Sequence, residues 1–138
     1  MDFSYVLTPF LAWLVAGSLK FAINSIRAGR WAFGLIGYGG IPSTHSAIVS
    51  STAALVAIRE GIGHPAFAVA ITLAFIVMLD AGSMRRQIGR QAEVLNRLAE
   101  QVGGGIRTSL RERMGHSVWE ILAGILVGVG VAAAVHAW

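Results

Sequence analysis

The stretch VWEILAGILVGVGVAAAVHAW, residues 118–138, decides the fold. Aside from Glu120 near its start, it carries no formal charge at neutral pH. About 20 mostly apolar residues are enough for one helix to cross a bilayer. Two further apolar runs precede it, and a fourth run is rich in Ser and Thr, which suits a helix packed against other helices. We therefore predict an all-α integral membrane protein, a bundle of about four transmembrane helices near residues 3–23, 43–60, 64–83 and 117–138.

The composition supports this fold class over the alternatives. Of the 138 residues, 55% are hydrophobic and 13% are charged, about half of the ~25% charge usual in soluble domains. This much apolar surface excludes a disordered chain, and the lack of cysteine excludes a disulfide-stapled secreted module. The net charge is +4, and the basic residues that produce it lie between apolar blocks. We therefore expect the bilayer as partner and no nucleic acid. The length fits one membrane domain, residues 1–138.

An amphipathic helix is predicted near residues 85–102, between the third and fourth spans. Apolar residues recur there at helical spacing, from Ile88 through Leu95 to Val102, with arginines and glutamates between them. Such a helix either lies on the membrane surface or packs over the mouth of the bundle. It is expected to end at the glycines of residues 103–105.

The basic residues indicate the orientation in the membrane. Nearly all of them fall in the loops near residues 24–44 and 84–116, which four spans place on one side. The positive-inside rule makes that side cytoplasmic, with both termini on the opposite side.

Ionisable residues at the edge of a span are costly, so each is a candidate for function. The four predicted spans place these candidates at the same depth, at the helix ends on one side of the membrane. They are Lys20, Arg27, His45, Asp80, Arg85, Arg86, His116 and Glu120. We expect them to converge as a polar site. Asp80 is assigned a supporting role, as the partner of Arg85 or Arg86.

The residue types in this cluster indicate phosphate chemistry. Lysine and arginine form an anion cradle, and the backbone N–H groups at the start of the second span favour a phosphate there. His116 and Glu120 are spaced i and i+4, so on a helix they share a face. A carboxylate so placed holds an imidazole in one tautomer, and His45 can serve as general acid. The pattern predicts phosphoryl transfer through histidine, with no metal and no cofactor.

Three motifs resemble a known superfamily. Gly40-Ile41-Pro42-Ser43-Thr44-His45-Ser46 resembles the Pro-Ser-Gly-His motif of type 2 phosphatidic acid phosphatases and vanadium haloperoxidases. Lys20-x6-Arg27 is similar to the first motif, Lys-x6-Arg-Pro, and His116-x3-Glu120 to the end of the third, Ser-Arg-x5-His-x3-Asp. The segments 80–86, 91–96 and 115–116 resemble a small branch, the acid phosphatase/vanadium-dependent haloperoxidase related (YuiD-like) family. The resemblance runs from about residue 5 to the end, and it implies a bacterial inner membrane or a plastid-type membrane.

The resemblance implies a role for each matching residue. His116 is the expected nucleophile, Glu120 orients it, and His45 protonates the leaving alcohol. Phosphate oxygens are expected to bind Lys20, Arg27, Ser43 and Thr44.

The chain also departs from the superfamily motifs. Ala28, Thr44 and Glu120 replace a proline, a glycine and an aspartate, and no Ser-Arg stands at its place before His116. We expect Arg85 or Arg86 to supply the missing guanidinium.

These features predict an integral membrane phosphatase acting on a lipid-linked phosphate or diphosphate, of the phosphatidate or polyprenyl phosphate type. The superfamily core usually needs more than four helices, so a homodimer is expected. The alternative is a non-catalytic membrane protein that binds anionic lipid headgroups, as a scaffold or lipid carrier. A small transporter is the third interpretation, and the lack of an internal repeat gives it little support.

Overall fold

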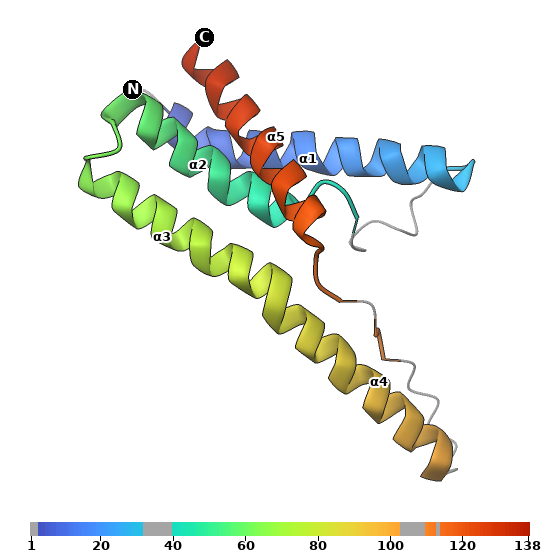
Figure 1. The fold of residues 1–138 in the computed structure, drawn as a ribbon. Helices are drawn as coiled ribbons and strands as arrows, with labels where there is room; N and C mark the ends of the chain where they lie inside the picture. The colour runs from blue at the N-terminus through green and yellow to red at the C-terminus, as the bar shows by residue number, and fades with distance from the viewer. Residues whose placement is uncertain (1–2, 32–39, 103–109, 113) are drawn as a thin grey trace.

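The computed structural model describes residues 3–31, 40–102, 110–112 and 114–138, and the regular structure in these ranges is helical throughout. Figure 1 shows a bundle from which one long helix projects. The elements in chain order are α1 (Ser4–Ala28), α2 (Thr44–Glu60), α3 (Pro65–Leu79), the π-helical turn η2 (Asp80–Met84), α4 (Arg85–Val102) and α5 (Val118–His136). The all-α prediction is thus confirmed for the described residues, while the predicted end of the amphipathic helix at residues 103–105 lies outside them.

Three helices of the described part are long and apolar enough to cross a membrane: Ser4–Ala28, Pro65–Gln101 and Val118–His136. The fourth predicted span corresponds to α2, which has 17 residues and a lower apolar content. α2 contacts α1, α3 and α5, and much of its surface is buried among them. Its role as a membrane span stays a prediction.

α2 and α5 pack with their backbones almost in contact. A Cβ atom added to Gly128 would lie 2.1 Å from Ser50 Oγ and 2.4 Å from Ala47 O, and one added to Gly124 would lie 2.3 Å from Ser43 O. Small residues permit such an approach, which maximises van der Waals contact between helices in lipid. The hydroxyl-rich composition of α2 therefore reflects close helix packing.

α3, η2 and α4 form one continuous helix of 37 residues, Pro65–Gln101. It begins at Pro65, whose fixed φ suits the first helical position, after the N-cap His64. Figure 1 shows α4 continuing along the direction of α3, away from the bundle. Of the two placements left open for the amphipathic helix, packing over the mouth of the bundle is not observed for the described residues. The uninterrupted helical hydrogen bonding through η2 explains this, because no turn redirects the chain.

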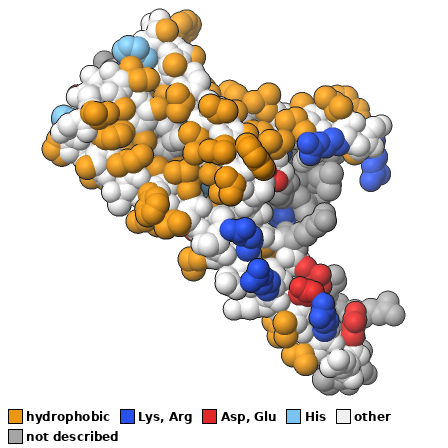
Figure 2. Space-filling view, in the orientation of Figure 1, with side chains coloured by type: hydrophobic (Ala, Val, Ile, Leu, Met, Phe, Trp, Pro, Cys, Tyr) orange, Lys and Arg blue, Asp and Glu red, His pale blue; other side chains and the backbone are white. Residues whose placement is uncertain are grey.

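Charged and apolar side chains occupy different parts of the molecular surface. In the space-filling view, hydrophobic side chains cover the bundle, whereas Lys, Arg, Asp and Glu gather over α4 and at one end of α1 (Figure 2). Such a division is typical of a chain whose bundle faces lipid and whose projecting helix faces water.

Residues 110–112 and 114–117, which lead into α5, lie along α4 and η2, and we call them the return segment. The Asn96 side chain holds this return segment: its Nδ2 donates to Leu110 O (2.8 Å) and Glu112 Oε1 (2.9 Å), and its Oδ1 accepts from Leu110 N (2.9 Å). Gly89 makes room for it, since an added Cβ would lie 2.2 Å from Glu112 O. The segment ends where His116 N donates to Ala81 O at 2.9 Å. Contacts with α4 and η2 thus hold the segment that carries His116.

Gly128→Ala is expected to lower the stability of the bundle by about 1–3 kcal/mol, the usual cost of overpacking a core. The new methyl group would overlap Ser50 Oγ and Ala47 O. Gly130→Ala is the matched control, because it gives α5 the same gain in helix propensity and its Cβ meets nothing within 4 Å. Thermal unfolding in detergent measures both variants. Equal melting temperatures would contradict the close α2–α5 contact.

Asn96→Ala is expected to loosen the return segment, because it removes three hydrogen bonds worth about 0.5–1.5 kcal/mol each. Amide hydrogen exchange at Leu110, whose N–H donates to Asn96, should accelerate. Glu100→Ala, on the exposed surface of the same helix, serves as control. Exchange at Leu110 as slow as in the parent chain would refute this role of Asn96.

Candidate active site at the helix junction

Two histidines from distant parts of the sequence lie close together at the end of the bundle from which α4 projects. His45 stands in the first turn of α2, and His116 precedes α5. Their ring centroids are 6.1 Å apart and the rings are nearly perpendicular, at 85°. This pair lies beside η2, where α3 passes into α4. The predicted convergence of helix ends is therefore observed for these two residues.

Backbone hydrogen bonds join the three helix ends that form the junction. Ser43 N donates to Glu120 O at 2.8 Å, which ties the start of α2 to the first turn of α5. Ser43 also caps α2, since its Oγ accepts from Ser46 N (3.3 Å) and Ser46 Oγ (3.0 Å). The bond from His116 N to Ala81 O ties the segment before α5 to η2. The two histidines are thus held by rigid backbone.

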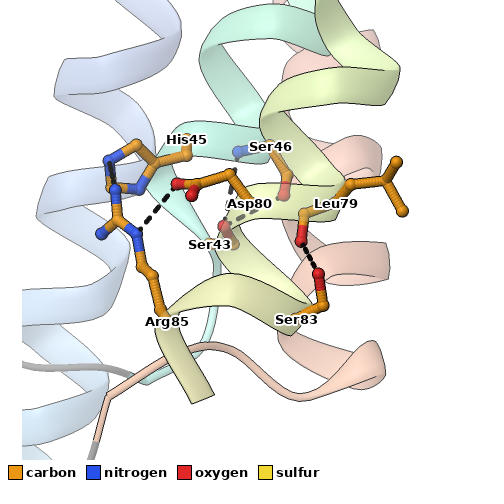
Figure 3. A network of polar contacts seen from close by, with 7 residues as sticks. All are labelled: Ser43, His45, Ser46, Leu79, Asp80, Ser83 and Arg85. Carbon is orange, nitrogen blue, oxygen red and sulfur yellow. Dashed lines mark hydrogen bonds and ion pairs between the residues drawn. The ribbon is translucent and has the colours of Figure 1, made fainter. Parts of the chain in front are cut away.

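Arg85 connects a carboxylate to the first histidine (Figure 3). Its Nε lies 3.3 Å from Asp80 Oδ2, and its Nη2 lies 3.3 Å from His45 Nε2. Arginine only donates hydrogen bonds and stays charged. His45 Nε2 must therefore accept, which leaves the ring hydrogen on Nδ1. That Nδ1 is buried and has no hydrogen-bond partner among the described residues.

His116 is the more deeply buried of the pair, with 7% of its surface exposed. Neither of its ring nitrogens has a hydrogen-bond partner in the described part of the chain. Burial lowers the pKa of His116, Lys20 lowers it further, and Glu120 raises it. The ring is therefore neutral at pH 7, with a free lone pair. Buried polar groups without partners are costly. A ligand that formed hydrogen bonds with these ring nitrogens would remove that cost.

The predicted helix face shared by His116 and Glu120 is wrong. α5 begins at Val118, so His116 lies before the helix. Ser117 caps it: Ser117 Oγ accepts from Glu120 N (3.3 Å), and Glu120 Oε2 accepts from Ser117 N (2.9 Å). This capping box has a sequence signal, Ser-x-x-Glu at residues 117–120, which the motif comparison passed over. The orienting role of Glu120 stays a prediction.

The other predicted phosphate ligands differ in how close they lie to the histidines. Lys20 is partly buried in α1 and near enough to lower the pKa of His116. Thr44 is the first residue of α2, directly before His45. Arg27 is exposed in the last turn of α1, and Arg86 donates from Nε to Gly82 O. In the described part, neither arginine forms a hydrogen bond or ion pair with His45 or His116.

Two residues of the family-like segments have roles that the sequence does not assign. Asn96 anchors the return segment leading to His116. Gly115 has a φ of 93°, and a Cβ added to it would lie 2.8 Å from Arg86 Cγ. A Gly-His pair before the last helix is consistent with this turn, because only glycine adopts that conformation readily. The predicted pairing of Asp80 with Arg85 is observed, whereas the catalytic assignments stay predictions.

Comparison with known proteins agrees with the motifs. The profile of the Divergent PAP2 family matches residues 1–131. A protein of Bacillus subtilis (strain 168), named uncharacterized membrane protein YuiD, is 30% identical over 139 residues, which cover 90% of this chain and 88% of that protein. No solved structure matches the chain. The resemblance inferred from the motifs is thus confirmed, and the chain belongs to the Divergent PAP2 family.

Proposed function

We propose that the protein is an integral membrane phosphatase that cleaves a lipid-linked phosphate or diphosphate through a phosphohistidine intermediate, without a metal. One observation carries the proposal. Three buried ring nitrogens, of His45 and His116, lack hydrogen-bond partners beside the guanidinium of Arg85. Such nitrogens next to a fixed cation suit an anionic group that binds between them.

A phosphate group fits the separation of the two rings. With the centroids 6.1 Å apart, its atoms can lie within hydrogen-bond reach, about 2.6–3.2 Å, of both rings. Arg85 is the proposed replacement for the missing Ser-Arg of the third motif, because its Nη2 is already at the junction. Arg86 is a weaker candidate, since its Nε is engaged by Gly82 O. Lys20 adds a second positive charge near His116.

The proposed reaction has two steps. A ring nitrogen of His116 attacks phosphorus, the bond from phosphorus to the ester oxygen breaks, and protonated His45 donates its proton to the leaving alkoxide. Water then attacks the phosphohistidine while His45 takes up a proton, which releases inorganic phosphate and restores both rings. Before the first step the Arg85 guanidinium moves from His45 Nε2 to the phosphate, which frees that nitrogen for the proton that His45 then donates.

The surroundings of the junction favour a lipid-linked substrate. Three helices are apolar enough to cross a bilayer, and large hydrophobic side chains are exposed on all of them, such as Phe10, Phe75 and Leu126. A junction at the end of these helices admits a headgroup while its tail stays in lipid. Phosphatidate or a polyprenyl phosphate has this form. The positive-inside rule then assigns the junction to the cytoplasmic side.

A second function has one observation in its favour. Glu120, the residue proposed to orient His116, has one carboxylate oxygen engaged by Ser117 N. Without an orienting carboxylate, the same cluster would bind anionic lipid headgroups and leave them intact. This alternative predicts lipid binding that survives removal of His116.

Purified protein in detergent with EDTA should release phosphate from a lipid phosphate, and orthovanadate should inhibit it. His116→Ala should lower kcat by at least about 10³-fold, because it removes the nucleophile. His64→Ala is the matched control, because His64 caps the start of α3, whereas the junction lies at the end of that helix. A requirement for a divalent metal would contradict the mechanism. Folded protein that binds lipid phosphates and releases none would favour the headgroup-binding alternative.

Activity should fall as the pH is lowered through the pKa of His116, because only the neutral ring attacks phosphorus. Burial holds that pKa below the ~6.5 of a free imidazole. Glu120→Gln removes the charge that raises this pKa, while glutamine still completes a capping box. The acidic limb of the kcat/KM profile should therefore move to lower pH. A limb that stays in place or moves upward would refute the assignment of His116 to it.

A further inference from the structure

One face of α4 exposes large apolar side chains. We call Met84, Ile88, Gln91, Leu95 and Leu98 the α4 seam. Met84 is 61% exposed, Ile88 47%, Leu95 53% and Leu98 49%. A groove runs beside the seam, lined by Gln87, Arg90, Gln91, Val94 and Leu95. The described residues of the return segment are held at a neighbouring face of the helix, from which Asn96 projects.

The spacing of the α4 seam is that of a coiled coil. Its residues are separated by four, three, four and three positions, which is the alternation of a heptad repeat. In that register Ile88 and Leu95 occupy a positions, while Met84, Gln91 and Leu98 occupy d positions. Ile88 at a and Leu98 at d match the pattern that favours parallel two-stranded pairing, and Gln91 is the one polar residue of the seam.

The charges of α4 avoid the seam. At 100° per residue, four charged side chains fall on the opposite side of the helix, Arg86, Glu93, Arg97 and Glu100. Arg90 lies at the far edge of the groove, outside the seam itself. The positions that flank a seam between two copies are uncharged apart from Arg85, which is held by Asp80. A second copy of α4 can therefore approach without like-charge repulsion.

Lipid is a poor occupant of this face. The continuous helix Pro65–Gln101 has 37 residues and is roughly 55 Å long, whereas the hydrocarbon core is about 30 Å thick. α4 prolongs α3 instead of turning into the membrane plane (Figure 1). When α3 crosses the bilayer, most of α4 stands in water. Its exposed seam then needs a protein partner.

We infer that two copies of this chain associate in parallel through their α4 seams, forming a short two-stranded coiled coil outside the bilayer. All copies insert with the same orientation, so a two-fold axis along the membrane normal makes the two α4 helices parallel. Two heptads are marginal alone, but α3 holds each α4 at the membrane and so raises its effective concentration. The inference is independent of the proposed function, because it uses no residue of the junction as a catalyst.

The lack of cysteine in the chain allows a direct crosslinking test. Leu95→Cys and Leu98→Cys, each alone in the full chain and in membrane vesicles, should form a disulfide-linked dimer of about twice 14.6 kDa under mild oxidation. Arg97→Cys, on the charged side, is the matched control. Differently tagged copies identify the partner as this chain. We expect at least tenfold more crosslinked dimer from the two seam positions than from Arg97→Cys.

A second measurement keeps the inference testable if a cysteine disturbs the helix. Leu95→Glu with Leu98→Glu should convert dimers into monomers, as counted by single-molecule photobleaching in nanodiscs. Arg97→Glu should leave the dimer intact. Equal crosslinking at all three positions, seam crosslinks to another protein, or a parent chain that is monomeric would each overturn the inference.

Discussion

The hydrogen bond from Ser43 N to Glu120 O is the constraint on which the candidate site depends. It joins the start of α2 to the first turn of α5, and it forms only where the two backbones nearly touch. Gly124 and Gly128 permit that approach, because any Cβ there would overlap α2. The same contact sets His45, two residues beyond Ser43, opposite His116, one residue before the cap of α5. Helix packing between small residues thus fixes the separation of the two rings.

A second constraint comes from the long helix. η2 presents Ala81 O to His116 N, and one turn later Arg85, the first residue of α4, contacts His45. The π-helical turn and the residue that follows it thus contact both histidines, which agrees with the frequent occurrence of π-bulges at functional sites. Asp80 holds the guanidinium, and Asn96 holds the segment that carries His116. The junction is preorganised by backbone contacts, by the Asp80–Arg85 ion pair and by Asn96, while three of the four ring nitrogens of His45 and His116 have no partner among the described residues.

More of the helical fold than of the candidate site can be predicted from the sequence. Apolar runs predict α1, α3 and α5 because lipid-facing helices must be apolar throughout, and depth in the membrane brings His45, Arg85 and His116 together. The prediction failed at Glu120, because spacing alone does not reveal where a helix begins; Ser117 decides that by capping. The direction in which α4 leaves the bundle was not predicted either. Hydrophobic periodicity shows which face of a helix is apolar, and it does not show where the helix points. The role of Asn96 depends on a contact across 14 residues, which no local pattern encodes.

The central claim is that the junction is an anion site between two histidines. The four histidines supply their own control, because His64 and His136 lie at the other ends of α3 and α5. We would label histidine with ¹⁵N, place the protein in a phosphate-free detergent with EDTA, and titrate orthovanadate while recording the ring nitrogen resonances. The account predicts saturable shifts for His45 and His116 and none for His64 and His136. Shifts of equal size at all four, or at none, would contradict it.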